Sequence, residues 1–152
     1  MKLRSIALTA VLCLITAVCF AGSPQMGTWK LNEGKSKLAT AAKNSTVVYE
    51  VVGDKIKVTV DGVDAAGKPS HNEWTGQFDG KDYPVTGDPT SDVRSYKKVD
   101  DHTLELSAKK GGKVTLTGKV VVSADGKVRT VTTSGADSMG MKMENVGVYD
   151  KQ

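Results

Sequence analysis

The 152-residue chain is poor in the residues that small proteins use for cross-linking or for chemistry. It has two cysteines, two histidines and four prolines, and only 5% of its residues are aromatic. Both cysteines, Cys13 and Cys19, lie in the first 21 residues, which we expect to be removed. The remaining chain then has no disulfide and no thiol nucleophile. A hydrophobic core must hold the fold alone, and a single domain of this length can bury roughly two-thirds of its unfolded surface.

Residues 1–21 are predicted to be a secretory signal peptide. Lys2 and Arg4 form a short basic start, and residues 5–20 follow without a charge. Small residues surround the expected cleavage site after Ala21. The uncharged stretch is shorter than the roughly 20 residues of a membrane span, which disfavours an uncleaved anchor. We therefore expect a secreted or periplasmic protein, with a single domain over 22–152 and no stable membrane insertion after cleavage.

The charge balance gives little reason to expect nucleic acid as a partner. The whole chain has 21 basic and 17 acidic residues. Loss of Lys2 and Arg4 leaves 19 basic residues against 17 acidic ones, a net charge of +2. The lysines fall mostly in turns and at outward strand positions, which indicates a solvated surface rather than a nucleic-acid patch.

Hydrophobic alternation predicts an all-β protein. In residues 55–65, Ile56, Val58 and Val60 alternate with polar residues, which is the period of a half-buried strand. Similar stretches recur along the chain, separated by short turns rich in Gly and Asp. There is no long helical pattern to cover an open sheet. We predict a single antiparallel up-and-down β-barrel of about 8–10 strands, with a two-sheet sandwich as the alternative.

An aromatic-rich stretch, residues 74–89, is the strongest local signal. Alternation from Trp74 to Phe78 predicts a strand, and Asp79-Gly80 predicts a two-residue hairpin turn. The return strand contains Pro84, which lacks an N–H, so it is expected at an edge or bend. We expect this stretch to supply much of the large-residue core.

Two short motifs resemble those of lipid-binding barrels. Gly27-Thr28-Trp29 resembles the Gly-x-Trp signature of the lipocalins, in which the tryptophan plugs the closed end of the barrel. The resemblance implies a structural plug at Gly27 and Trp29. Residues 148–151 resemble the end of fatty-acid-binding proteins, and most of the chain after residue 21 resembles small secreted bacterial proteins described as lipocalin-like. That resemblance implies a fold and a compartment, and no established activity.

The chain departs from the fatty-acid-binding proteins in two places. Residues 32–44 are too short for their helix-turn-helix lid, and could form a loop or a few helical turns. Gly147 stands where those proteins carry an arginine for the fatty carboxylate. A carboxylate site at that position therefore does not carry over to this chain.

No motif predicts catalysis, a metal or a cofactor. His71 and Glu73 share one strand face, but two ligands are fewer than a zinc site needs. Most carboxylates fall in turns, where turn chemistry explains them. Met139, Met141 and Met143 alternate as strand residues do. Core packing is the favoured interpretation of these methionines, and copper(I) binding is the alternative.

We predict a barrel that binds a small, mostly apolar ligand. The alternative is a structural or protein-binding barrel with a filled interior, and an enzyme is the third candidate. An inward Arg94 would favour an anionic ligand, although an outward orientation is the commoner one. The candidate lining residues are Tyr49, Trp74, Phe78, Tyr83, Arg94 and Tyr96.

Overall fold

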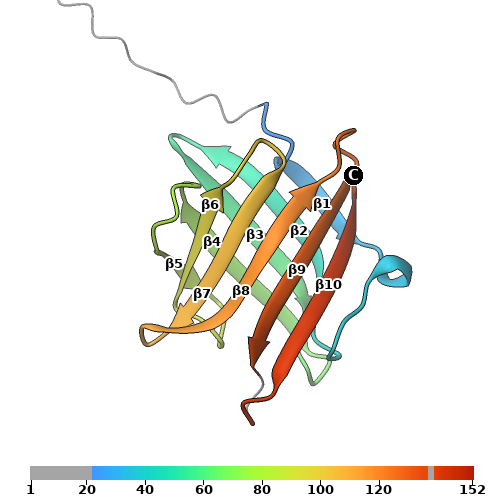
Figure 1. The fold of residues 1–152 in the computed structure, drawn as a ribbon, viewed down its shortest axis with the longest axis vertical. Helices are drawn as coiled ribbons and strands as arrows, with labels where there is room; N and C mark the ends of the chain where they lie inside the picture. Colours follow the sequence, from blue (N-terminus) through green and yellow to red (C-terminus); the bar gives the residue numbers. More distant parts are fainter. Residues whose placement is uncertain (1–21, 137–138) are drawn as a thin grey trace, which may run out of the picture.

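The computed structural model describes residues 22–136 and 139–152, which form a closed barrel of ten antiparallel strands (Figure 1). Each strand pairs with its neighbours in sequence, and β1 closes the barrel by pairing with β10. The predicted all-β up-and-down barrel is therefore confirmed, and the sandwich alternative is wrong. The predicted signal peptide lies outside the described residues.

The strands are joined mostly by short turns. Their bounds are β1 Gly27–Leu31, β2 Lys43–Val52, β3 Lys55–Val63, β4 Pro69–Gly76, β5 Tyr83–Thr86, β6 Val93–Lys98, β7 Thr103–Lys110, β8 Lys113–Val122, β9 Val128–Ala136 and β10 Lys142–Lys151. The only helical turn among the described residues is a 3-10 helix, η1 (Glu33–Lys35). No helix in the described part of the chain is long and apolar enough to cross a membrane.

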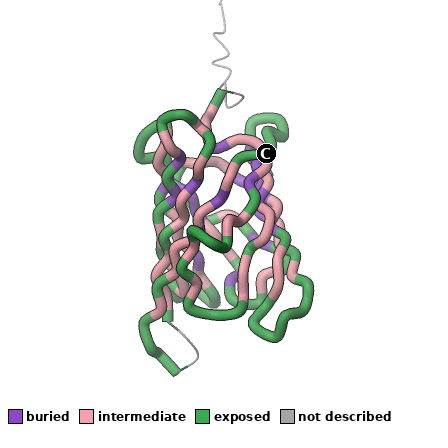
Figure 2. Tube along the Cα trace, turned by 90° about the vertical axis from the view of Figure 1, so that its right-hand side faces the viewer, coloured by how far each residue is buried: buried purple, intermediate pink, exposed green. Residues whose placement is uncertain are grey.

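The core follows from the period of the strands. Along β3, the inward residues Ile56, Val58 and Val60 are at most 5% exposed, while their neighbours face solvent. In Figure 2 the buried segments concentrate toward the end of the barrel where the C terminus lies. We call this the closed end, and we call the end with the β7–β8 and β9–β10 turns the open end. The closed end also holds Trp29, which is completely buried.

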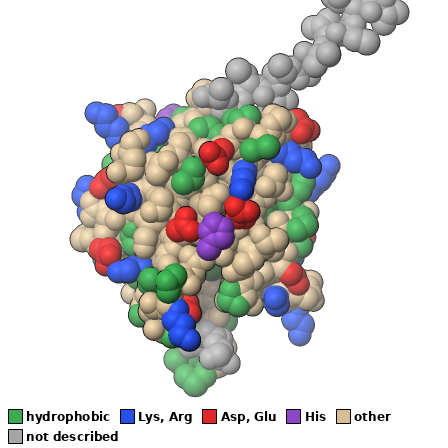
Figure 3. Space-filling model, turned by 180° about the vertical axis from the view of Figure 1, so that it is seen from behind, with side chains coloured by type: hydrophobic (Ala, Val, Ile, Leu, Met, Phe, Trp, Pro, Cys, Tyr) green, Lys and Arg blue, Asp and Glu red, His purple; other side chains and the backbone are tan. Residues whose placement is uncertain are grey.

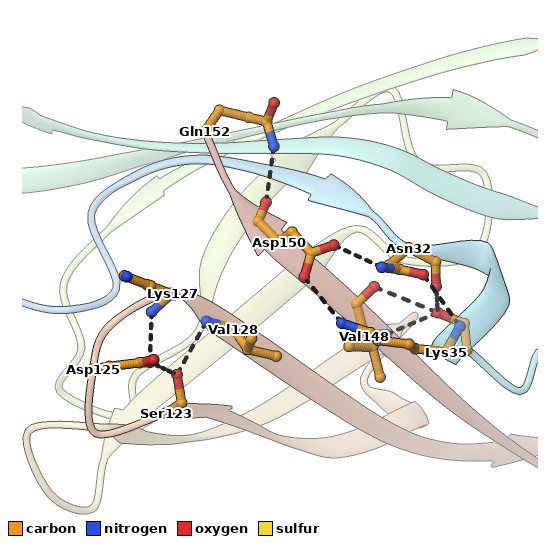
Figure 4. A network of polar contacts seen from close by, with 10 residues as sticks. Asn32, Lys35, Ser123, Asp125, Lys127, Val128, Val148, Asp150 and Gln152 are labelled. Carbon is orange, nitrogen blue, oxygen red and sulfur yellow. Dashed lines mark hydrogen bonds and ion pairs between the residues drawn. The ribbon is translucent and has the colours of Figure 1, made fainter.

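A polar network reinforces the seam between β1 and β10 (Figure 4). Asn32 follows β1 and caps η1, and its side-chain amide donates to Asp150 on β10 at 2.7 Å. The Ser36 hydroxyl accepts from the backbone N–H of Val148 at 2.9 Å. Residues 32–42 thus run along β10, with only η1 in place of a helical lid.

The aromatic-rich stretch differs from its prediction. Strand β4 ends at Gly76, and Trp74 pairs with Val85, so residues 77–82 form a longer connection than a two-residue hairpin. Asp79-Gly80 instead lies beside β6, where Gly80 N donates to the carbonyl of Tyr96. The hairpin was predicted from Asp79-Gly80 alone, whereas the contact with β6 involves residues 16 positions further along the chain. The return strand β5 is short and pairs with each neighbour at only two positions.

Candidate functional site

Five of the six predicted lining residues form one aromatic cluster. Trp74 packs edge-to-face on Tyr96 with ring centroids 4.8 Å apart, and on Tyr83 at 5.7 Å. Tyr49 lies 6.3 Å from both Tyr96 and Phe78. Tyr49, Trp74 and Tyr96 are buried, while Phe78 and Tyr83 are partly buried against them. The closed barrel thus brings together aromatic side chains from β2, β4, β5, β6 and the 77–82 connection.

Arg94, the sixth predicted residue, lies on the same inward face of β6 as Tyr96. Its guanidinium donates to the Asp88 carboxylate at 3.0 Å and to the Asn72 side-chain oxygen at 3.3 Å. The Arg94 and Asp88 side chains are only 11% and 14% exposed. Arg94 is therefore a charged interior residue whose partner is already supplied by the protein.

Burial alone would raise the pKa of Asp88. Hydrogen bonds from Ser91 and Thr90, together with the positive charge of Arg94, outweigh that effect and hold the pKa below its ordinary value. Asp88 is therefore ionised at neutral pH, and the charges of Asp88 and Arg94 balance.

Arg129, on β9, has no such partner. The residue is 3% exposed, and its Nη2 donates to the Tyr49 hydroxyl at 2.6 Å. Its guanidinium lies over two rings, with its carbon 4.9 Å from the Tyr49 centroid and 5.3 Å from that of Tyr149. Nε and Nη1 have no hydrogen-bond partner among the described residues. No carboxylate in the described part of the chain forms an ion pair with Arg129.

The interior therefore has an unbalanced positive charge. The charges of Arg94 and Asp88 balance, whereas no carboxylate among the described residues pairs with the Arg129 guanidinium. Burial raises the pKa of Tyr49 far above its usual range, although Arg129 partly opposes this. Burial likewise raises the pKa of Tyr149, again opposed by Arg129. Neither hydroxyl can supply a negative charge to Arg129.

Trp29 lies at the closed end, where the resemblance placed a plug. Its indole N–H donates to the backbone carbonyl of Gln25 at 3.0 Å, and Lys151 lies over its ring at 5.1 Å. Gln25 is itself 1% exposed and donates to the His102 carbonyl. Gly27, which begins β1, has a φ of 104° that disfavours any other residue there.

The inward-facing side chains of β8, β9 and β10 are more exposed toward the open end than toward the closed end. There several inward-facing residues are half-buried, although their neighbours closer to Trp29 are buried. On β7, by contrast, the inward residue Ala108 is buried at this end. These half-buried inward residues are Leu106, Leu116, Val131, Thr133 and Met143.

Two of the three alternating methionines do not pack in the core. Met139 and Met141 precede β10 and are 78% and 58% exposed, so the core-packing interpretation is wrong for both. Only Met143 lies on the inner face, where it is half-buried. The pattern failed because β10 begins at Lys142, after these two residues.

His71 lies on the outer face of the barrel, beside Asp61 and Glu73. Figure 3 shows a histidine side chain next to acidic side chains on one face of the molecule. Its Nδ1 is 2.6 Å from Asp61, and its Nε2 is 3.7 Å from Glu73, which also pairs with Lys57. The hydrogen bond to Asp61 is the main cause that raises the pKa of His71. Among the described residues, no group of three or more His, Cys, Asp or Glu side chains could hold a metal ion.

A polar hollow of about 460 Å³ lies along β7–β10. Thr117, Lys119, Thr132 and Glu144 are among the residues that line it, and it includes no aromatic side chain. None of the six predicted lining residues contributes to it.

Sequence reasoning missed Arg129 and its surroundings. Residues 128–136 contain Val128 and Val131 at positions of opposite parity, so the alternation did not reveal which face turns inward. The partner residues Tyr49 and Arg129 are 80 positions apart, a separation that local pattern cannot bridge. The available signal was that Arg129 is two residues before Val131, so both side chains point to the same face of one strand.

No family model matches the chain, and no curated protein is similar enough to it to count as a match.

Proposed function

We propose that the barrel binds a small, mostly apolar molecule that carries one anionic group. The observation that carries this proposal is Arg129, a buried arginine with two nitrogens that lack partners among the described residues. A buried charge costs several kcal/mol unless it is paired. An anionic ligand would supply the missing partner, and it would also satisfy donors that are otherwise buried without one.

The apolar part of the ligand would supply most of the affinity. Ligand sites are usually apolar, with a few polar groups that set orientation. Around Arg129 the interior offers aromatic and aliphatic surface, and burial of apolar area contributes about 25 cal/mol per Å². Arg129 would then act as the orienting contact, while Arg94 stays paired with Asp88.

The proposed setting is a secreted or periplasmic lipocalin-like protein. This rests on the basic and apolar features of residues 1–21 and on the Gly-x-Trp motif, together with the closed barrel. Extracytoplasmic carriers of this kind enclose their ligand within the barrel.

The alternative function is a structural or protein-binding barrel with a filled interior. The aromatic cluster favours this alternative, because Tyr49, Trp74 and Tyr96 are at most 3% exposed. It leaves the unpaired Arg129 unexplained, since a filled structural core is more stable with an apolar residue in that place.

The test is binding of matched amphipathic compounds by native mass spectrometry, with tryptophan fluorescence as a second readout. Dodecanoate and dodecanol share an apolar chain and differ in charge. We expect dodecanoate to bind at tens of micromolar or below, and dodecanol to bind more weakly by about tenfold or more.

Arg129→Met should remove this preference, while Lys119→Met, an exposed outer-face control, should keep it. Equal binding of both compounds to wild type and to Arg129→Met would refute the role of Arg129, and no binding of either would favour the structural alternative.

A further inference from the structure

The alternating methionines before and at the start of β10 form a sequence motif that core packing does not explain. Met139 and Met141 are 78% and 58% exposed, although methionine is ordinarily among the most buried residue types. Met143, the second residue of β10, is half-buried on the inner face. Met1 belongs to the segment that we expect to be removed, and Met26 packs against the core. The mature chain therefore gathers three of its four thioethers within five residues at the open end.

The spacing of these residues allows their side chains to meet. Met141 and Met143 are two positions apart, which puts two side chains on one side of an extended chain with Cα atoms about 7 Å apart. Gly140 has a φ of 79°, in the left-handed region, so the chain turns between Met139 and Met141. The methionine side chain is unbranched and rotates about three bonds. Three such side chains have the reach to bring their sulfur atoms around one small ion.

The side chains next to Met143 offer a metal ion little oxygen or nitrogen. Met143 pairs with Gly135, which brings no side chain, and the Leu116 Cδ1 atom lies 3.8 Å from the position that a Cβ on Gly135 would take. Lys142 and Glu144 alternate with Met143 onto the outer face, where they pair with each other at 2.9 Å. An ion bound at the three methionines would therefore depend on sulfur.

We propose that Met139, Met141 and Met143 bind one copper(I) ion through their thioether sulfurs at the rim of the open end. Soft thioether ligands select copper(I), whereas magnesium and calcium prefer oxygen, and zinc prefers thiolate, imidazole or carboxylate. Both cysteines lie in residues 1–21, so no thiol of the mature chain competes for the ion. This site shares no residue with the interior around Arg129, and it adds a second binding activity to the proposed function.

The experiment uses mature protein with carbon-13 in its methionine methyl groups, which gives one signal for each of Met26, Met139, Met141 and Met143. Silver(I), a soft ion of the same charge, is titrated in air, and copper(I) is titrated without oxygen in the presence of ascorbate. We expect the signals of residues 139, 141 and 143 to shift together until one ion is bound per chain, while that of Met26 stays in place. Zinc(II) should shift none of the four. A shift of Met26 alone, or no shift with either soft ion, would overturn the proposal.

Leucine variants separate a ligand role from packing, because leucine has a similar volume and no sulfur. The variants Met139→Leu, Met141→Leu and Met143→Leu should each weaken copper(I) binding about tenfold or more in competition with bicinchoninate. Met26→Leu is the matched control and should leave the affinity within about twofold. Unchanged binding in Met143→Leu would show that the half-buried sulfur is not a ligand, and a site of three thioethers would be wrong.

The pH dependence of the affinity provides a further check on the ligand type. A thioether has no proton to release when it binds a metal, unlike imidazole, thiol or carboxyl groups. We therefore expect the copper(I) affinity of the wild type to agree within about twofold between about pH 5.5 and about pH 7.5. A steep loss at the lower pH would identify other ligands and contradict the proposal. Failure of these tests leaves the anion proposal as it stands, since Arg129 has no part in them.

Discussion

Arg129 sets the electrostatics of the interior, because it is the one buried cation among the described residues whose charge no carboxylate there balances. Its hydrogen bond to Tyr49 and its two aromatic contacts compensate only part of the desolvation. A buried charge without an ionised partner lowers the free energy of unfolding of the ligand-free protein. Residues kept in spite of such a loss of stability are often ones that a function requires.

Replacement of Arg129 should therefore not harm the unliganded fold. Arg129→Met keeps the length of the side chain and removes the unpaired charge, so we expect the free energy of unfolding to stay equal or to rise by about 1–4 kcal/mol. Urea denaturation of the ligand-free protein measures this. A loss of more than about 2 kcal/mol would mean that Arg129 is a net stabilising part of the core.

Trp29 should behave in the opposite way. It is completely buried, and its N–H is paired with the Gln25 carbonyl. We expect Trp29→Ala to lower the free energy of unfolding by about 3–5 kcal/mol, because it removes a large, completely buried side chain. Val99→Ala, at a 53% exposed position, is the control and should change stability by less than about 0.5 kcal/mol. A loss below about 1 kcal/mol for Trp29→Ala would remove the case for a structural plug.

At the scale of elements, β5 is the weakest part of the barrel wall. It has four residues, and Pro84 cannot donate a hydrogen bond. Next to β5, the Arg94 guanidinium on β6 donates hydrogen bonds to Asn72 on β4 and to Asp88 in the 87–92 loop. The hydrogen bond to Asn72 thus bridges β4 and β6, the two strands that β5 links at only two positions each.

The Asp88–Arg94 pair should make stability sensitive to acid. The pKa of Asp88 is held below its unfolded value of about 3.9, so the unfolded chain binds the proton first. The stability that Asp88 contributes is fully present above about pH 4–5 and is lost as the pH falls through the lower pKa of the folded state. Asp88→Asn should lower the free energy of unfolding at neutral pH by on the order of 3 kcal/mol and flatten its dependence on pH below 4.

Asp101→Asn is the matched control, since this carboxylate pairs with Lys98 but is 78% exposed. It should change stability by less than about 1 kcal/mol at neutral pH. Equal effects of the two substitutions would show that the buried pair does not hold the 87–92 loop.

The elements show how far the sequence could predict the structure. Alternation in residues such as Ile56, Val58 and Val60 predicted strands and a barrel correctly, because each strand has one buried face. It also placed Trp74 and Phe78 on one strand face, and Tyr49 on one face with Val47 and Val51. It could not predict the connection at 77–82, which depends on a contact with β6, or the pairing of Arg129 with Tyr49 across the barrel. Such contacts depend on closure of the sheet, which no local window contains.

At the scale of the whole molecule, the barrel combines a closed end filled with large side chains and an open end whose inner face is half-buried. Trp29 and Val58 are completely buried, whereas Leu116 and Thr133 keep contact with solvent.

Export is a prediction about the whole chain. The basic start and the uncharged stretch at residues 5–20 predict cleavage after about residue 21. Intact-mass measurement of secreted or periplasmic protein should show a chain that begins near Gly22. Recovery of membrane-bound protein that still carries Met1 would contradict the proposed compartment.

The most direct test of the interior anion site is a crystal structure of the protein grown with dodecanoate. The carboxylate should lie inside the barrel, within hydrogen-bond distance of the Arg129 guanidinium. Dodecanoate found only on the outer surface, with Arg129 still enclosed by the rings of Tyr49 and Tyr149, would contradict an anion-binding interior.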